Sequence, residues 1–171
     1  MTDLELTSEA PLKRIDDMIA AGAPLSETLE ELIRYVESRS RAGMIASILV
    51  LDKDGKHLRH GAGPSLPEAY NKAIDGLEIG PEVGSCGTAA HFNKPVVVFD
   101  IANNRLWEKF KDLALGHGLR ACWSTPIRGA DGKVLGTFAN YYPVVRDPSP
   151  VDRELTTEIT REAAKAIEAA R

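Results

Sequence analysis

Cysteine, aromatic residues and clustered basic residues are all scarce in this 171-residue sequence. Its two cysteines cannot form a disulfide framework, and no C-x-x-C spacing indicates a metal or redox motif. Aromatic residues make up 6% of the chain. Lysine and arginine are dispersed among acidic residues and the net charge is −4, which argues against a general nucleic-acid-binding or anionic-membrane surface.

Long hydrophobic runs and common catalytic motifs are absent too. The longest apolar run, 44–51, contains Ser47 and is far shorter than the ~20 residues that span a bilayer. The first ten residues are acidic and do not resemble a signal peptide, so we expect a cytoplasmic protein without membrane insertion. No G-x-x-x-x-G-K-[ST], G-x-G-x-x-G or G-x-S-x-G motif is present, so neither a nucleotide-phosphate loop nor a hydrolase is expected.

The apolar pattern predicts one domain in which helices alternate with hairpins. Residues 1–11 are expected to lack regular structure, and Asp54-Gly55 and Ala130-Asp131-Gly132 are predicted hairpin turns. The pattern predicts helices over 11–21, 25–40, 67–74, 86–93, 106–115 and from 152 onward, and strands over 44–51, 57–61, 95–100, 119–127 and 133–142. This order indicates an α+β fold with an antiparallel sheet and the first and last helices on one face. We divide the chain into an N-terminal segment with a short helix, 1–22, and a domain with a C-terminal signalling helix, 23–171.

The stretch 80–127 holds both cysteines and both tryptophans and is the candidate site. Its glycines permit a sharp turn into the helix 86–93. Ser85 is the predicted N-cap, accepting a hydrogen bond from the amide of Gly87 or Thr88. The free amides of a helix start suit a small anion, although a capped helix without a ligand explains the same residues.

Four segments of this sequence resemble the GAF domains found in bacterial sensory proteins. They read G-P-E-V-G-S-C-G-T-A-A, V-V-V-F-D-I, G-L-R-A-C-W-S-T-P-I and G-K-V-L-G-T-F-A-N-Y-Y. The resemblance implies a five- or six-stranded antiparallel sheet with terminal helices on one face. Short helices and loops would form a ligand pocket on the other face. GAF domains bind cyclic nucleotides, bilins, haem, nitrate or other metabolites, and some only dimerise, so the fold does not decide the function.

With this resemblance, the sequence predicts a site for a small polar or anionic ligand. It does not identify the ligand or any cofactor. The ligand would lie between the helix start at 85–88 and a lid over 100–115. Trp107 and Tyr141 would offer an N–H and an O–H group. Cys122 and Trp123 alternate along one strand, so only one of them faces the pocket. The predicted ligand-binding residues are Val83, Ser85, Cys86, Gly87, Thr88, Ile101, Trp107, Trp123 and Tyr141.

Cys86 leaves an enzymatic alternative open. A branch of the family that reduces free methionine-(R)-sulfoxide carries a cysteine in the same C-G-T-A-A motif. The loop that supplies a further cysteine in that branch reads N-N-R-L-W-E-K-F here. Free cysteines are most often small buried apolar residues. The sequence therefore favours a sensor without catalysis over the reductase, with a ligand-free dimerisation module as the third hypothesis.

No metal or nucleic-acid partner is expected. His57 and His60 are three positions apart on a predicted strand, so their side chains diverge. The expected partners are a second copy of the chain and a histidine kinase or other output domain, in cis or in trans.

Overall fold

A computed structural model describes residues 3–171, with side chains described from residue 10 onward. The elements in chain order are α1 (Asp3–Ala20), α2 (Leu25–Arg39), β1 (Ile45–Leu51), β2 (His57–Ala62), α3 (Glu68–Ile74), β3 (Leu77–Glu78), α4 (Cys86–Phe92), β4 (Val96–Val98), η1 (Ile101–Asn103), η2 (Arg105–Trp107), α5 (Lys111–Gly116), β5 (Ala121–Arg128), β6 (Val134–Tyr142) and α6 (Pro150–Ala169). The strands form one antiparallel sheet in the order β3-β2-β1-β6-β5-β4. The predicted α+β fold is confirmed.

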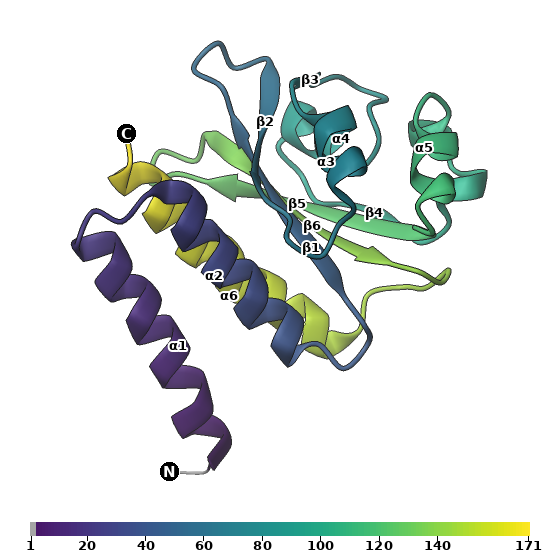
Figure 1. The fold of residues 1–171 in the computed structure, drawn as a ribbon. Helices are drawn as coiled ribbons and strands as arrows, with labels where there is room; N and C mark the ends of the chain where they lie inside the picture. The colour runs from purple at the N-terminus through teal and green to yellow at the C-terminus, as the bar shows by residue number, and fades with distance from the viewer. Residues whose placement is uncertain (1–2) are drawn as a thin grey trace.

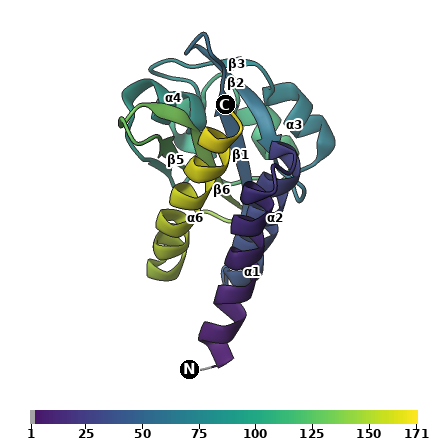
Figure 2. The same cartoon turned by 90° about the vertical axis from the view of Figure 1, so that its left-hand side faces the viewer.

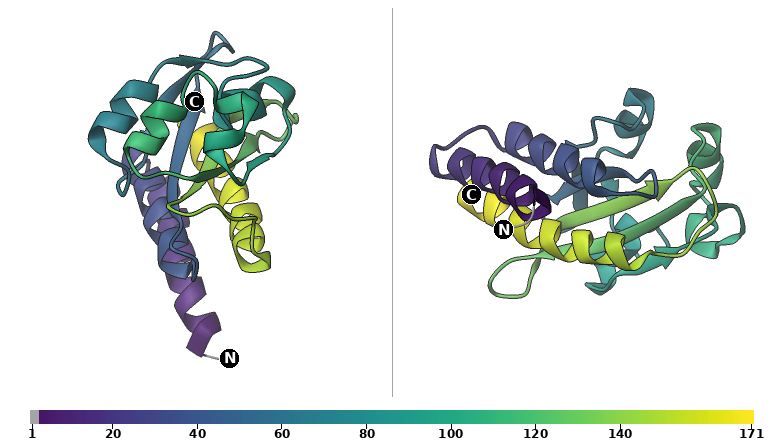
Figure 3. Two further views of the ribbon diagram at one scale, coloured as in Figure 1. Left: turned by 90° about the vertical axis from the view of Figure 1, so that its right-hand side faces the viewer. Right: turned by 90° about the horizontal axis from the view of Figure 1, so that it is seen from below.

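Two layers of helices enclose the sheet (Figure 1). Helices α2 and α6 lie against one face, and α1 packs outside them (Figure 2). The short helices α3, α4 and α5 and the two 3-10 turns η1 and η2 lie on the opposite face (Figure 3). The sheet therefore separates a helix-side core from a second apolar core under the short helices.

The helix-side core forms because α2 and α6 are amphipathic. Leu29, Leu32 and Val36 of α2 are fully buried, as are Ile159 and Ala163 of α6. These positions recur at helical spacing and place one apolar stripe of each helix on the sheet. Helices α2 and α6 therefore cover this face; the last helix lies there as predicted, and the first helix, α1, lies on the same side but packs on α2 and α6. None of the helices within residues 3–171 is long and apolar enough to cross a membrane.

The first helix is longer than predicted. It spans Asp3–Ala20 and contains Pro11, whereas we expected residues 1–11 to lack regular structure; residues 1 and 2 lie outside the described part. Its first turns extend beyond α2 and α6 (Figure 2). An ion pair joins Asp16 to Lys165 of α6 at 3.2 Å.

The central strands β1 and β6 approach each other closely. A Cβ atom at Gly136 would lie 2.1 Å from the carbonyl oxygen of Leu49, so only glycine fits there. The alternation predicted for 133–142 fails at Val134 and Leu135. Ile127 pairs with Gly136 and Arg128 with Val134, which leaves Leu135 in a bulge. Leu135 therefore turns into the helix-side core rather than toward the face of Ala139 and Tyr141.

The predicted helix over 106–115 is divided into η2 and α5. Phe110 between them has φ −124°, which is not helical. With this break, the Trp107 ring is buried in the cavity-side core and the Phe110 ring packs against the same core. Strand β3 was not predicted, because two residues are too few to show an alternating pattern.

Candidate functional site

A small cavity lies between the sheet and the short helices. Its volume is about 20 Å³, enough for roughly one water molecule. The lining is mostly apolar and comes from seven elements and the turn before α4: Leu49, Tyr70, Ile74, Leu77, Val83, Gly84, Ser85, Cys86, Trp107, Phe110, Leu113 and Tyr141. The sheet forms the floor, and the η2–α5 segment (105–116) covers the cavity as its lid.

Ser85 joins the lid to the sheet. The Trp107 Nε1–H donates to Ser85 Oγ at 3.0 Å, and Ser85 Oγ donates to the Cys122 carbonyl at 2.9 Å. Ser85 is fully buried and Trp107 is 4% exposed. The predicted N-cap role of Ser85 is wrong: its backbone is already helical, at φ −83° and ψ −45°, and its hydroxyl points to β5. The chain of two hydrogen bonds holds the lid closed over the cavity.

Gly87 and Thr88 shape the turn rather than line the cavity. Thr88 Oγ1 donates to the Gly84 carbonyl at 2.6 Å and accepts from the Val83 amide at 3.0 Å. A Cβ atom at Gly87 would lie 2.6 Å from the Val83 side chain. Gly84 has φ +58°, a conformation that favours glycine. Its amide donates to the Leu106 carbonyl at 2.7 Å, which is the second hydrogen bond that holds the lid.

Two tyrosines form the polar part of the cavity. The hydroxyl oxygens of Tyr70 and Tyr141 are 2.9 Å apart, and the rings meet edge to face with centroids 5.6 Å apart. Both are buried, and burial raises the pKa of Tyr70 and of Tyr141 well above the ordinary value. Both hydroxyls stay protonated, so each can donate or accept a hydrogen bond.

The two cysteines come together on the cavity face of the sheet. Cys86 lines the cavity, and Cys122 lies in the same apolar core. The groups that act on the pKa of Cys86 include the Cys122 thiol and the hydroxyls of Ser124 and Thr137. Hydrogen bonding from the Cys122 thiol, assisted by the two hydroxyls, lowers the pKa of Cys86 despite burial. Burial raises the pKa of Cys122.

Trp123 does not belong to the site. It lies in the helix-side core, with its ring 4.5 Å from that of Tyr142. Alternation along β5 turns Cys122 to the cavity and Trp123 to α2 and α6. Ile101 is fully buried on the cavity side but does not line the cavity. Of the nine predicted residues, the structure brings five to the cavity wall: Val83, Ser85, Cys86, Trp107 and Tyr141.

Sequence reasoning missed Tyr70, Ile74 and the apolar lid residues Phe110 and Leu113. Tyr70 and Ile74 are four positions apart on α3, which puts them on one helix face. That spacing was a usable signal for a buried face, but it does not show which part of the sheet the face meets.

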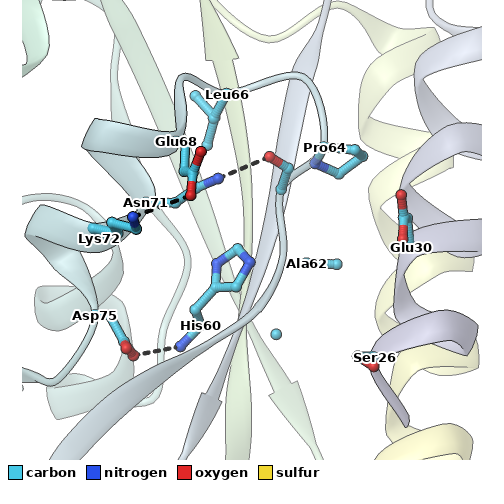
Figure 4. A pocket seen from close by; sticks show the side chains of 12 residues that line it. Ser26, Glu30, His60, Ala62, Pro64, Leu66, Glu68, Asn71, Lys72 and Asp75 are labelled. Atoms are coloured by element: carbon cyan, nitrogen blue, oxygen red, sulfur yellow. Dashed lines mark hydrogen bonds and ion pairs between the residues drawn. The ribbon is translucent and has the colours of Figure 1, made fainter. Parts of the chain in front are cut away.

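A wider hollow of about 470 Å³ lies between α2 and the β2–α3 segment (Figure 4). Its charged groups are bound within the protein. Lys72 pairs with Glu68 at 3.1 Å, and Asp75 accepts from the His60 amide at 2.8 Å. We therefore assign no ligand to this hollow. Residues 10–171 also contain no group of three or more histidine, cysteine or acidic side chains placed to hold a metal ion.

A sheet with long terminal helices on one face and a cavity under short helices on the other defines an α+β domain of the GAF type. The chain belongs to the GAF domain family, whose sequence model matches residues 22–168.

The chain is similar to the methyl sulfide methyltransferase-associated sensor of Methanosarcina acetivorans. The two are 37% identical over 155 residues, covering 91% of this chain and 15% of the relative, so the chain spans a small part of that protein.

Solved structures share the fold. The GAF domain of an Acinetobacter phosphoenolpyruvate-protein phosphotransferase has a TM-score of 0.71 at 18% identity, with 99% of this chain and 96% of that chain covered. The free methionine-R-sulfoxide reductase of Neisseria meningitidis, in complex with its substrate, has a TM-score of 0.68 at 18% identity, with 100% and 94% covered. At these identities the likeness shows the fold alone.

Proposed function

We propose that this GAF domain is a non-enzymatic sensor that binds a small polar molecule in the cavity under the lid. The observation that carries the proposal is the lidded cavity itself: an apolar wall with a few convergent polar groups is the usual form of a small-molecule site. Val83, Ser85, Cys86, Trp107 and Tyr141 would contact the ligand. Gly87, Thr88 and Ile101 would hold the frame behind them.

Binding requires the lid to move, because the closed cavity holds about one water molecule. Opening breaks the Trp107–Ser85 hydrogen bond and the Gly84–Leu106 hydrogen bond. A ligand that replaces these hydrogen bonds with its own shifts the population toward the open lid. Ser85 Oγ, the Trp107 N–H and the tyrosine hydroxyls are the groups released for it. The proposed ligands include small anions.

The signal would pass through β6 to the terminal helices. Tyr141 faces the cavity, and the next residue, Tyr142, faces the helices and donates to buried Asp152 at the start of α6. Ser40, just after α2, donates to the same carboxylate at 3.3 Å. A shift of β6 therefore displaces α6 relative to α2. We propose that a second copy of the chain and a histidine kinase or other output domain read this displacement.

The proposal is tested by a thermal-shift screen of nitrate, small carboxylates, free amino acids and cyclic nucleotides. A ligand should raise the melting temperature of the wild-type chain and of Trp123→Phe, because Trp123 lies on the helix side. It should have a much smaller effect on Trp107→Ala. If no compound in these classes shifts the wild-type chain, the dimerisation module without a ligand is favoured instead.

The reductase is the second candidate, because Cys86 has a thiol partner in Cys122. It is tested with free methionine-(R)-sulfoxide and a dithiol reductant. Turnover that is lost in Cys86→Ser would overturn the non-enzymatic proposal.

A further inference from the structure

Strand β4 leaves one edge of the sheet open. Within residues 3–171 it is the outermost strand, paired on one side with β5, and the short helix α4 packs against it (Figure 1). The backbone amides and carbonyls on the free side of an edge strand can pair with a further strand. Val97 is 42% exposed, and Phe99, directly after the strand, is 54% exposed. Such an apolar edge is suited to the addition of a strand from another chain.

More exposed apolar side chains gather beside this strand. The Arg146 amide donates to the Phe99 carbonyl at 3.1 Å, which brings the loop after β6 next to β4. Val144 and Val145 in this loop are 54% and 53% exposed. Of the six large apolar side chains that are exposed in the described part of the chain, four therefore lie on this edge or in the loop next to it. We call Val97, Phe99, Val144 and Val145 the edge patch.

The residues that flank the strand carry one charge of each sign. Lys94 lies three positions before Val97, and Asp100 lies three positions after it. Lys94 is exposed and Asp100 is half-buried. Within residues 10–171 neither side chain takes part in an ion pair. Asp100 accepts one hydrogen bond, from Asn103 at 2.8 Å, on one of its two carboxylate oxygens.

This charge pattern matches a second copy of the same strand in antiparallel orientation. When Val97 lies opposite Val97 of the partner subunit, Lys94 lies opposite Asp100 of the partner subunit. The symmetry of the pair repeats this contact, so two ion pairs flank an apolar centre. A slip of one residue would lose both ion pairs.

The same register suits the ends of the strand. Phe99 lies opposite Pro95 of the partner subunit. Proline has no N–H group, and the Phe99 carbonyl already accepts from Arg146, so these two groups do not need each other as partners. A lysine and a proline at the start of an edge strand disfavour pairing with most strands. A strand with an acidic residue at the matching position, as in a second copy, is the exception.

We propose that β4 is a dimerisation edge, at which two copies of the chain pair in antiparallel orientation around Val97 and join their sheets. Residues 94–100, 144 and 145 form the contact, which is fewer than the roughly 20–30 residues a side of a stable complex. We therefore expect a weak dimer, with a dissociation constant on the order of 100 μM.

This inference goes beyond the proposed sensor function, because the pairing needs no ligand. It gives a position to the second copy that was proposed above. Helix α6 packs on β5, the neighbour of β4, so a second copy at this edge is close to the element whose displacement we propose as the signal.

The test measures self-association of the full chain by sedimentation without any ligand, at concentrations from about 10 μM to 1 mM. The wild-type chain should form a dimer within this range. Lys94→Glu and Asp100→Lys each place like charges opposite each other and should weaken the dimer about tenfold or more. The double variant should recover the wild-type association. Lys53→Glu, in the β1–β2 turn, is the control with the same change of charge and should associate like the wild-type chain.

Val97→Cys tests the register without changing charge. Opposed residues of an antiparallel pair have Cα atoms about 4.5–5.5 Å apart, which a disulfide can bridge. Oxidation with diamide should link two Val97→Cys chains, whereas Lys53→Cys should give no more covalent dimer than the wild-type chain. A wild-type chain that stays monomeric, a dimer that Lys94→Glu leaves unchanged, or no cross-link in Val97→Cys would overturn the proposal. Each of these results would leave the proposed ligand site standing, because no ligand takes part in the measurements.

Discussion

Ser85→Ala is the substitution that most directly tests how the lid is held. It removes the acceptor of the Trp107 indole N–H at 3.0 Å and the donor to the Cys122 carbonyl at 2.9 Å. A buried donor without a partner costs about 1–3 kcal/mol, and a lost hydrogen bond about 0.5–1.5 kcal/mol. We expect the free energy of unfolding to fall by about 2–4 kcal/mol. For a domain of this size, that lowers the melting temperature by roughly 5–10 °C.

Ser47→Ala is the matched control. Ser47 is also buried, at 1% exposure, but its hydroxyl has no partner in the described part of the chain. Removing it should change the free energy of unfolding by less than about 1 kcal/mol. Denaturant unfolding of both variants measures the difference, and hydrogen exchange should show faster opening of 105–116 only in Ser85→Ala. Equal stability losses in the two variants, or an unchanged lid, would refute the reasoning.

Three further predictions concern the parts that position the site. Burial, and the hydrogen bond to Asp152, raise the pKa of Tyr142 above its ordinary value near 10. The folded chain therefore keeps a proton that the unfolded chain loses, so the free energy of unfolding should fall as the pH rises above about 10. In Tyr142→Phe this fall should be less steep by about 1.4 kcal/mol per pH unit. An unchanged slope in denaturant unfolding would contradict this. At neutral pH, Tyr142→Phe should lower the free energy of unfolding by about 1–3 kcal/mol, because buried Asp152 loses a hydrogen-bond donor. Calorimetry measures this loss, and a loss below about 0.5 kcal/mol would contradict the prediction. Gly136→Ala should lower the free energy of unfolding by more than about 3 kcal/mol, because the new Cβ would lie 2.1 Å from a backbone oxygen. The control is Gly116→Ala in α5, where a Cβ meets nothing within 4 Å, so thermal unfolding should show a neutral or stabilising effect.

The sheet could be predicted because its signals are local. The buried strand at 44–51 is nearly all apolar, and Asp54-Gly55 and Asp131-Gly132 mark the hairpin turns that set its neighbours. The first turns of α1 could not be predicted, since they extend past the helices α2 and α6 that form the core (Figure 2). The break between η2 and α5 occurs beside a tertiary hydrogen bond from Trp107 to Ser85, which no local pattern contains.

The site was predicted in part for the same reason. The turn before α4 and the lid are marked by glycines and by aromatic residues in one continuous stretch. Alternation shows that Cys122 and Trp123 face opposite ways, but only the placement of the terminal helices decides which one meets the cavity. Tyr70 lies outside this stretch, on α3, and its tertiary contacts with Tyr141 and His117 cannot be read from the sequence pattern. The division of the chain at residue 22 stays a prediction.

The indole N–H resonances of the two tryptophans test the central claim most directly. Trp107 lines the cavity and Trp123 lies in the opposite core, so a ¹⁵N-labelled chain carries one reporter on each face of the sheet. Titration with the compounds that raise the melting temperature should shift the Trp107 resonance in a saturable way and leave that of Trp123 nearly unchanged. Saturable binding that leaves the Trp107 resonance in place, or shifts only that of Trp123, would contradict a ligand site under the lid.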